Sequence, residues 1–241
     1  MTIKAIIFDV DGTLADTEDG HRMSFNKAFA ENGLDWSWDV ALYDRLLKVT
    51  GGKERIKYFV ESFSSGFTKP DNFEEFVKHL HKVKTAHYTT MLREGRIPLR
   101  PGIKQLIGDA RAAGITLAIA TTTTPENVSA LLEVGLGKSW ADYFAANGCG
   151  DIVPHKKPAP DIYFWVLDKL GLPADACIAL EDSENGLRSS LAAGVKTFVT
   201  INHYTRNQNF TGAAGVFDDL SNLENFYRAT GLPLPKPKIT V

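Results

Sequence analysis

A nearly unbroken apolar run opens the chain. Residues 3–10 read Ile-Lys-Ala-Ile-Ile-Phe-Asp-Val, and this β-branched run predicts a strand buried on both faces of a parallel sheet. The turn residues Asp11-Gly12-Thr13 follow it. From about Glu18 to Glu94 the apolar side chains instead recur every three or four residues. This spacing predicts about four helices that form a small bundle.

Strand and helix patterns alternate beyond Pro101. Thr124 is a candidate N-cap for a helix that begins at Pro125, and Gly171 and Gly194 are expected to end the next two helices. Alternating strands and helices imply a parallel sheet with helices on both faces. The expected strands are 115–120, 178–180 and 195–201, and the other expected helices span 161–170 and 185–193.

These patterns divide the chain into an α/β part and a helical part. We predict the α/β class, with a Rossmann-like parallel sheet as the core and a helical-bundle cap inserted after the first strand. The core domain comprises residues 1–16 and 96–230, and the cap domain comprises residues 17–95. The Pro- and Lys-rich residues 231–241 are expected to form an extended tail.

Composition and charge restrict the partners. The 27 basic and 29 acidic residues leave a net charge of −2, which argues against a general nucleic-acid binder. The charge of any bound anion must therefore be met locally. No apolar run approaches the ~20 residues of a membrane span. We expect a small-molecule ligand, no nucleic acid and no membrane, and we also expect a monomer.

The two cysteines indicate the redox state of the cell compartment in which the protein is expected. Cys149 and Cys177 form no C-x-x-C pair, so a reducing compartment is expected. The first residues lack the character of a targeting peptide. We expect a cytoplasmic protein, or one of the plastid stroma if a transit peptide has been removed.

Residues suited to chemistry occur in four short segments, each expected at the C-terminal end of a strand, which is the sheet edge where open α/β folds bind ligands. Asp9 and Asp11 come at the end of the first strand, where one carboxylate can attack an electrophile while the other handles a proton. An ordinary Asp-Gly turn is the plain alternative. A calcium loop is excluded, because Thr13 and Gly20 stand where it needs ligating side chains.

The other three segments each allow a functional and a structural interpretation. The hydroxyls of residues 121–124 suit an anion at a helix N-terminus, or simply a helix cap. Two prolines hold the next loop extended, so Lys157 can be aimed at a phosphoryl group, although surface lysine pairs are usually solvated. Glu181 and Asp182 can bind a hard cation, or Asp182 or Ser183 can cap the following helix.

Together, these four segments resemble the motifs of the haloacid dehalogenase superfamily of phosphotransferases, in the same order at successive strand ends. The resemblance implies that Asp9 is the nucleophile and forms an aspartyl-phosphate. It also implies that Asp11 is the general acid and base, and that Thr121 and Lys157 hold the phosphoryl group. Asp11 favours a phosphate ester over a halide, because an alkoxide leaving group needs a proton. The implied Mg²⁺ ligands are Asp9, Asp11 (through its backbone carbonyl), Glu181 and Asp182.

The predicted cap contains a short segment suited to a second anion. Gly51 and Gly52 let backbone N–H groups approach an anion. Lys53 and Arg55 lie just beyond them and can add charge. An ordinary turn before a helix, with both side chains in solvent, is the alternative.

Three more side chains of the predicted cap are candidates for substrate contact. Glu18 and His21 share one helix face; Glu18 can bind a sugar hydroxyl, whereas His21 is expected to be structural. Tyr43 can reach a phosphate through its hydroxyl, or it can pack in the bundle. The expected substrate-binding residues are Glu18, Tyr43, Thr50, Gly51, Gly52, Lys53, Arg55 and Thr122.

Within that superfamily, the chain looks like the CbbY family, which accompanies Rubisco of the Calvin cycle. The resemblance implies hydrolysis of xylulose 1,5-bisphosphate to xylulose 5-phosphate, with one phosphate at Asp9 and Mg²⁺ and the other at residues 50–55. The stretches that carry it are 9–18, 50–55, 120–123, 156–163, 180–186 and Tyr204-Thr-Arg206.

Two other functions stay open. The β-phosphoglucomutases share the fold and the catalytic aspartates, so a mutase or another sugar-phosphate phosphatase is the alternative. A non-catalytic binding module is disfavoured, because the four residues that such a module is expected to lose are all present: Asp9, Asp11, Lys157 and Asp182.

Overall fold

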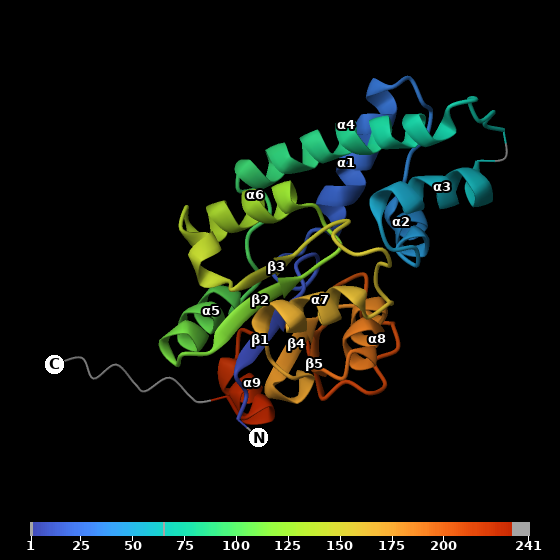
Figure 1. Ribbon diagram of the computed structural model, residues 1–241. Helices are drawn as coiled ribbons and strands as arrows, with labels where there is room; N and C mark the ends of the chain where they lie inside the picture. Colours follow the sequence, from blue (N-terminus) through green and yellow to red (C-terminus); the bar gives the residue numbers. More distant parts are fainter. Residues whose placement is uncertain (1, 65, 233–241) are drawn as a thin grey trace.

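The computed structural model describes residues 2–64 and 66–232. At its centre is a six-stranded sheet in the order β3-β2-β1-β4-β5-β6, in which every neighbouring pair is parallel (Figure 1). The predicted α/β class with a Rossmann-like parallel sheet is confirmed. The strands are β1 (Ala5–Phe8), β2 (Thr116–Ala120), β3 (Ala146–Gly148), β4 (Cys177–Glu181), β5 (Lys196–Thr200) and β6 (Gly215–Phe217).

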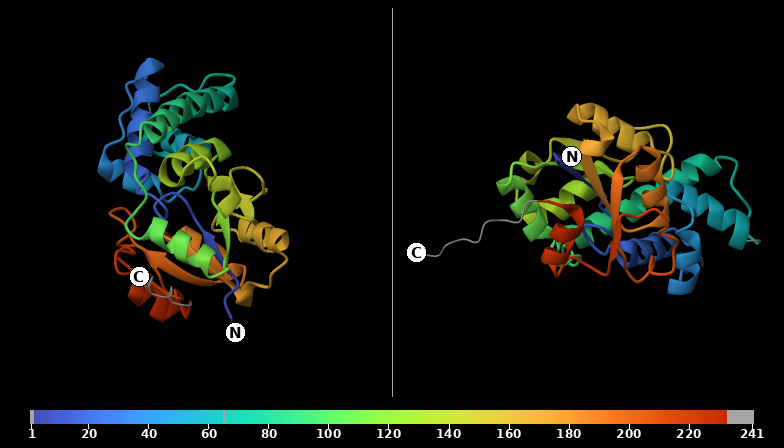
Figure 2. Two further views of the ribbon diagram at one scale, coloured as in Figure 1. Left: turned by 90° about the vertical axis from the view of Figure 1, so that its left-hand side faces the viewer. Right: turned by 90° about the horizontal axis from the view of Figure 1, so that it is seen from below.

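Helices cover both faces of this sheet (Figure 2). All four side chains of β1 are fully buried. Ile6 and Phe8 belong to the core shared with α5 (Ile103–Ala112), α6 (Pro125–Leu136) and α9 (Leu223–Thr230). Ala5 and Ile7 belong to the opposite core, with α7 (Asp161–Leu170), and α8 (Glu184–Ala192) packs beside α7. Burial on both faces explains the continuous apolar run of β1.

Four helices lie between β1 and α5, and we call them the cap helices: α1 (Glu18–Glu31), α2 (Val40–Leu46), α3 (Gly52–Phe63) and α4 (Phe73–Arg93). They gather beyond one end of the sheet (Figures 1 and 2). Their shared core is rich in aromatic rings, with Trp38 packed against Phe25 and Phe29. The cap helices therefore have a hydrophobic core of their own.

Several elements do not follow from the predicted patterns. β3 and β6 have three residues each, which is too short to display a hydrophobic period. The prediction also lacks α5 and α9, although α5 buries apolar residues at helical spacing. Short 3₁₀ turns at Trp140–Tyr143 and Ala174–Ala176 complete the described elements.

The last described residues belong to the packed core. Gly231 ends α9 in the left-handed conformation, and Leu232 is buried against the sheet. Residues 233–241, most of the predicted extended tail, lie outside the described residues. In the described part of the chain, no helix has both the length and the apolar character that a membrane crossing requires.

The two connections between the sheet and the cap helices run side by side. Ala15 lies before α1 and forms a β-bridge with Leu99, which lies after α4. The backbone N–H of Arg100 donates to the carbonyl oxygen of Leu14 at 2.8 Å. Both connections therefore pass through one short paired segment.

The Arg100 side chain holds this segment to the sheet. It is buried and donates to the carbonyl oxygens of Gly12 (2.5 Å), Thr200 (3.0 Å), Ile201 (2.6 Å) and Asp218 (2.8 Å). These carbonyls belong to the turn after β1 and to the residues at or beyond the ends of β5 and β6. One guanidinium group thus fixes the turn after β1 against two other strand ends.

We expect Arg100→Leu to lower the free energy of unfolding by about 3 kcal/mol or more, because several buried carbonyls lose their donor. Urea denaturation measures this change. The control is Arg228→Ala, which removes an exposed Arg228–Glu224 pair on α9 (3.0 Å) and should cost less than about 0.5 kcal/mol. Equal losses in the two variants would show that the Arg100 contacts contribute little.

Candidate active site

A cavity of about 1150 Å³ lies between the strand ends and the cap helices. Tyr43 and Glu181 are bonded to residues of its wall: Tyr43 to Glu18, and Glu181 to Lys157. The structure thus brings the predicted residues of the sheet and of the cap helices to one site. Those that line the cavity are Asp9, Asp11, Glu18, Thr50, Gly51, Gly52, Lys53, Arg55, Thr121, Thr122, Lys157 and Asp182.

Lys157 is the buried cation at the sheet end of the cavity. Its Nζ donates to Asp9 Oδ1 at 2.6 Å, to Glu181 Oε1 at 2.7 Å and to the carbonyl oxygen of Ala120 at 2.8 Å. The side chain is 5% exposed, so it is not part of a solvated surface pair. The expectation that the loop around Lys157 is extended is wrong. The loop forms a turn, in which the backbone N–H of Ala159 donates to the carbonyl oxygen of Lys156.

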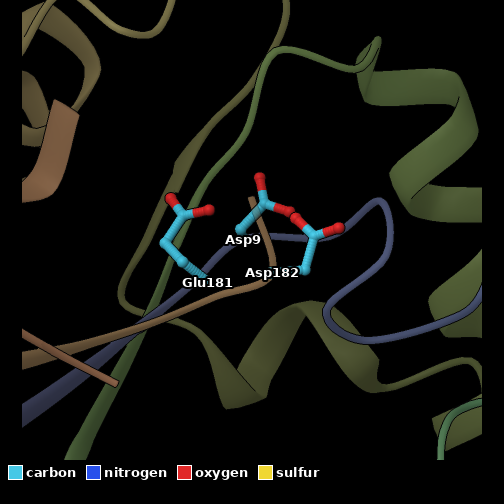
Figure 3. A group of neighbouring side chains, drawn as sticks. All are labelled: Asp9, Glu181 and Asp182. Carbon is cyan, nitrogen blue, oxygen red and sulfur yellow. The ribbon is translucent and has the colours of Figure 1, made fainter. Parts of the chain in front are cut away.

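Three carboxylates gather around this lysine. Asp9 stands between Glu181 and Asp182, with the three carboxyl groups on the same side (Figure 3). One oxygen from each lies within 4.8 Å of the others. Burial raises the pKa of Asp9 to about 8, with Lys157 opposing and Glu181 adding to the increase. Burial and the neighbouring Asp9 and Glu181 charges also raise the pKa of Asp182.

This arrangement fits a hard divalent cation. The three carboxylates can carry more negative charge than the single ammonium group of Lys157 compensates. Carboxylate oxygens are also the ligands that Mg²⁺ prefers. Glu181 Oε2 is buried and has no hydrogen-bond partner among the described residues. The helix cap is supplied by Ser183, whose Oγ accepts from the N–H of Gly186. Asp182 is therefore free of the capping role.

Asp11 belongs to a second buried chain of polar groups. His21 Nε2 lies 3.0 Å from Asp11 Oδ1, and His21 Nδ1 contacts the Nζ of Lys84. Burial acts to raise the pKa of Asp11, but the charge and hydrogen bond of His21, helped by Thr17, outweigh it and hold this pKa at about 2. Asp11 is thus ionised in the free protein.

Lys84 and His81 also line the cavity and were not predicted. Burial lowers the pKa of Lys84 to about 7 and the pKa of His81 to about 3. Lys84 continues the apolar stripe of α4 that includes Val77 and Leu80. A lysine on the buried side of an amphipathic helix was the signal in the sequence.

The cap helices supply the other end of the cavity. Arg55 Nη1 donates to the hydroxyl of Tyr43 at 2.8 Å, and that hydroxyl donates to Glu18 Oε2 at 3.1 Å. Arg55 Nε is buried and has no partner among residues 2–64 and 66–232. Gly51 has φ = 100°, a conformation that favours glycine, and places the first turn of α3 at the cavity wall.

Other predicted residues make contacts across the cavity. Lys53 Nζ pairs with Asp151 Oδ2 at 3.0 Å, and Thr50 Oγ1 accepts from Asn185 Nδ2 at 3.1 Å. Thr121 is buried, and its Oγ1 accepts from the backbone N–H of Thr123 at 3.2 Å. The helix α6 begins at Pro125 as predicted, but its N-cap residue makes no side-chain capping bond.

We expect the stability difference between Lys84→Met and the wild type to depend on pH. Above about pH 7 folded Lys84 is neutral, whereas the unfolded side chain keeps its proton up to its ordinary pKa of 10.5. Because the unfolded state then binds more protons, wild-type stability rises with pH in this range. The melting temperature of the variant relative to the wild type should therefore fall between about pH 7 and pH 9.5.

The matched control is Lys82→Met, at an exposed position of the same helix. Its melting temperature relative to the wild type should stay constant over that range. A constant difference for Lys84→Met as well would show that burial does not lower the pKa of this lysine.

Comparisons with known proteins identify the family. The family model of haloacid dehalogenase-like hydrolases matches residues 3–194. Protein CbbY of Cupriavidus necator is 49% identical over 220 residues, which cover 91% of this chain and 87% of that protein. The crystal structure of CbbY from Rhodobacter sphaeroides in complex with phosphate has a TM-score of 0.86 and 44% identity, covering 92% of this chain and 96% of that chain.

A mutant of that Rhodobacter sphaeroides protein, in complex with xylulose-(1,5)bisphosphate, matches with the same TM-score and identity. Both the sequence and the fold are therefore similar to CbbY proteins over most of the chain. The chain belongs to the haloacid dehalogenase-like hydrolases and, within them, to the CbbY-type proteins.

Proposed function

We propose that this protein is a Mg²⁺-dependent phosphatase that converts xylulose 1,5-bisphosphate to xylulose 5-phosphate. The observation that carries the proposal is one cavity with two ends: the Asp9–Lys157 pair at the sheet, and Arg55 with the first turn of α3 at the cap helices. A substrate with two phosphates uses both ends. The complex of a similar CbbY protein with xylulose-(1,5)bisphosphate supports this choice of sugar.

Asp9 is placed to attack phosphorus and form an aspartyl-phosphate. Lys157, held at 2.6 Å from Asp9 Oδ1, and the buried Thr121 are placed to hold the phosphoryl oxygens. Asp9 and Asp182, with Glu181 and the backbone carbonyl of Asp11 as further donors, would hold Mg²⁺, which supplies positive charge against those oxygens.

Asp11 is the proposed proton carrier. His21 fixes one oxygen of its carboxyl group, and the residue lines the cavity. The carboxyl group gives a proton to the leaving alkoxide and takes one from the water that attacks the aspartyl-phosphate. The negative charge of a bound phosphate favours the protonated form that the first step needs.

The cap helices are proposed to bind the rest of the substrate. The Arg55 guanidinium and the backbone N–H groups around Gly51 and Gly52 take the second phosphate, with Thr50 and Lys53 at its edge. The remaining proposed contacts, to the sugar hydroxyls, are those of Glu18, Tyr43 and Thr122.

We also propose domain boundaries, an oligomeric state and a cell compartment for this protein. We assign the core domain to residues 1–16 and 96–230 and the cap domain to residues 17–95. The protein acts as a monomer in the cytoplasm, or in the plastid stroma. The free thiols of Cys149 and Cys177, both buried, are compatible with such reducing compartments.

A panel of substrates tests this function. With Mg²⁺ present, we expect xylulose 1,5-bisphosphate to be turned over with a higher kcat/KM than ribulose 1,5-bisphosphate, β-glucose 1-phosphate or phosphoglycolate, and EDTA to abolish turnover. Asp9→Asn, which keeps the side-chain volume, should have no activity but a similar fold by circular dichroism. Conversion of β-glucose 1-phosphate to glucose 6-phosphate without free phosphate would establish the mutase instead.

We expect Arg55→Ala to raise KM for the bisphosphate about tenfold to a hundredfold, because a charged hydrogen-bond donor to the second phosphate is lost. The KM for a monophosphate should change little. The matched control is Arg45→Ala, since Arg45 also lies over an aromatic ring, that of Phe63, but outside the cavity. Equal effects of Arg55→Ala on both substrates would remove Arg55 from the second phosphate site.

A further inference from the structure

The loop that follows β5 contacts both halves of the active site. Tyr204 and Asn202 lie two residues apart on it, and Tyr204 lines the cavity. The Tyr204 side chain lies among the cap helices, whereas the Asn202 side chain lies at the carboxylates of the sheet end. One short turn therefore connects the two ends of the proposed substrate site.

Tyr204 belongs to the hydrophobic core of the cap helices, although the chain places it in the sheet domain. It is 9% exposed and packs in the same cluster as Trp38 and Tyr43. Its ring lies perpendicular to that of Tyr43, with centroids 6.0 Å apart. Its hydroxyl donates to Asp19 Oδ1, in the first turn of α1, at 2.6 Å.

Tyr43 is in turn the partner of Arg55. The Arg55 guanidinium donates to the Tyr43 hydroxyl at 2.8 Å and lies 5.1 Å from the ring centroid. A displacement of Tyr43 therefore moves the group proposed to bind the second phosphate. Tyr204 thus contacts the Tyr43 ring from outside the cap helices.

Asn202 makes the contact at the other end of the turn. Its Nδ2 donates to Asp182 Oδ2 at 2.7 Å. Its Oδ1 accepts from the backbone N–H groups of Tyr204 (2.9 Å) and Thr205 (3.1 Å). Because the oxygen is used by the turn itself, the amide can present only its nitrogen to Asp182. The turn that shapes the backbone at Tyr204 thus also orients a proposed metal ligand.

We propose that the turn Asn202–Thr205 is a positioning element that aligns the two ends of the substrate site. Tyr204 holds Tyr43, and with it Arg55, at the distance that the second phosphate requires, while Asn202 orients Asp182 for the cation. This inference rests on the proposed function, because it uses the second phosphate site at Arg55. Neither residue touches the reacting atoms, so both act through their neighbours.

The test of Tyr204 compares two substrates. Tyr204→Ala should lower kcat/KM for xylulose 1,5-bisphosphate about three- to tenfold, mainly through KM, since it removes the contact with the Tyr43 ring. Turnover of p-nitrophenyl phosphate, which has no second phosphate, should change less than twofold. Tyr204→Phe keeps the ring and should restore most of the bisphosphate kcat/KM.

Tyr227→Ala is the matched control. Tyr227 is as buried as Tyr204 and also donates to an aspartate, Asp109, at 2.6 Å, but it lies in the core beside α5. The Tyr227→Ala variant should have a lower melting temperature but the same ratio of kcat/KM values for the two substrates. If Tyr204→Ala lowers kcat/KM equally for both substrates, so that their ratio is unchanged, the role of Tyr204 is overturned.

The test of Asn202 needs no substrate. Isothermal titration with Mg²⁺ should give a dissociation constant about tenfold higher for Asn202→Ser, which keeps an acceptor for the turn but cannot reach Asp182. Tyr204→Phe should leave this constant unchanged. An unchanged constant for Asn202→Ser would overturn the role of Asn202.

Failure of the proposed function gives a different result. If the wild type hydrolyses p-nitrophenyl phosphate but not xylulose 1,5-bisphosphate, the proposed substrate is wrong. The Tyr204 comparison is then made with ribulose 1,5-bisphosphate, which also has a second phosphate, with the same expected and overturning ratios. If neither bisphosphate is hydrolysed, the role of Tyr204 falls with the proposed function, whereas the Mg²⁺ titration of Asn202→Ser stands unchanged.

Discussion

The candidate active site is organised by one buried lysine among three buried carboxylates. Lys157 pairs with Asp9 and Glu181, and Asp9 stands between Glu181 and Asp182 (Figure 3). Removing charges from water is costly, and a single ammonium group compensates only part of this negative charge. The raised pKa of Asp9 and Asp182 expresses that imbalance. A site in which carboxylates outnumber the cationic groups is suited to a cation.

The sheet provides the rigid support that such a cluster needs. Asp9 follows β1, and Glu181 and Asp182 lie at the end of β4, the neighbour of β1 in the sheet. Their backbone positions are therefore set by strand pairing, and their side chains start from adjacent strand ends. The cap helices close the other side of the cavity with Arg55, Tyr43 and Glu18. Because the net charge of the chain is small, the charge of an anionic ligand would have to be met locally, by groups such as Lys157 and Arg55.

The parts that could be predicted from the sequence are those with local signals. The β1 run, the helical spacing of 18–94 and the order of the four polar segments predict the fold and the residues of the cavity. The contacts of Glu181 with Lys157 and of Lys84 with His21 could not be predicted in this way. They result from packing between elements that are distant in the chain. The stretch Tyr204-Thr-Arg206 could be singled out by resemblance, but its contacts could not be predicted, because the partner Tyr43 lies in another part of the sequence. The three-residue strands β3 and β6 are likewise defined by their neighbours in the sheet.

The paired connections at Ala15 and Leu99 restrict how the cap helices can move. Two connections that left the sheet at separate points would allow the cap helices to slide, tilt and twist. Here both leave through one bridge, and Arg100 anchors its base to the turn after β1. The bridge thus restrains the base of the cap helices, and a hinge rotation of these helices would turn close to Asp9 and Asp11. A rotation about this base would change the Arg55 end of the cavity most and the Asp9 end least.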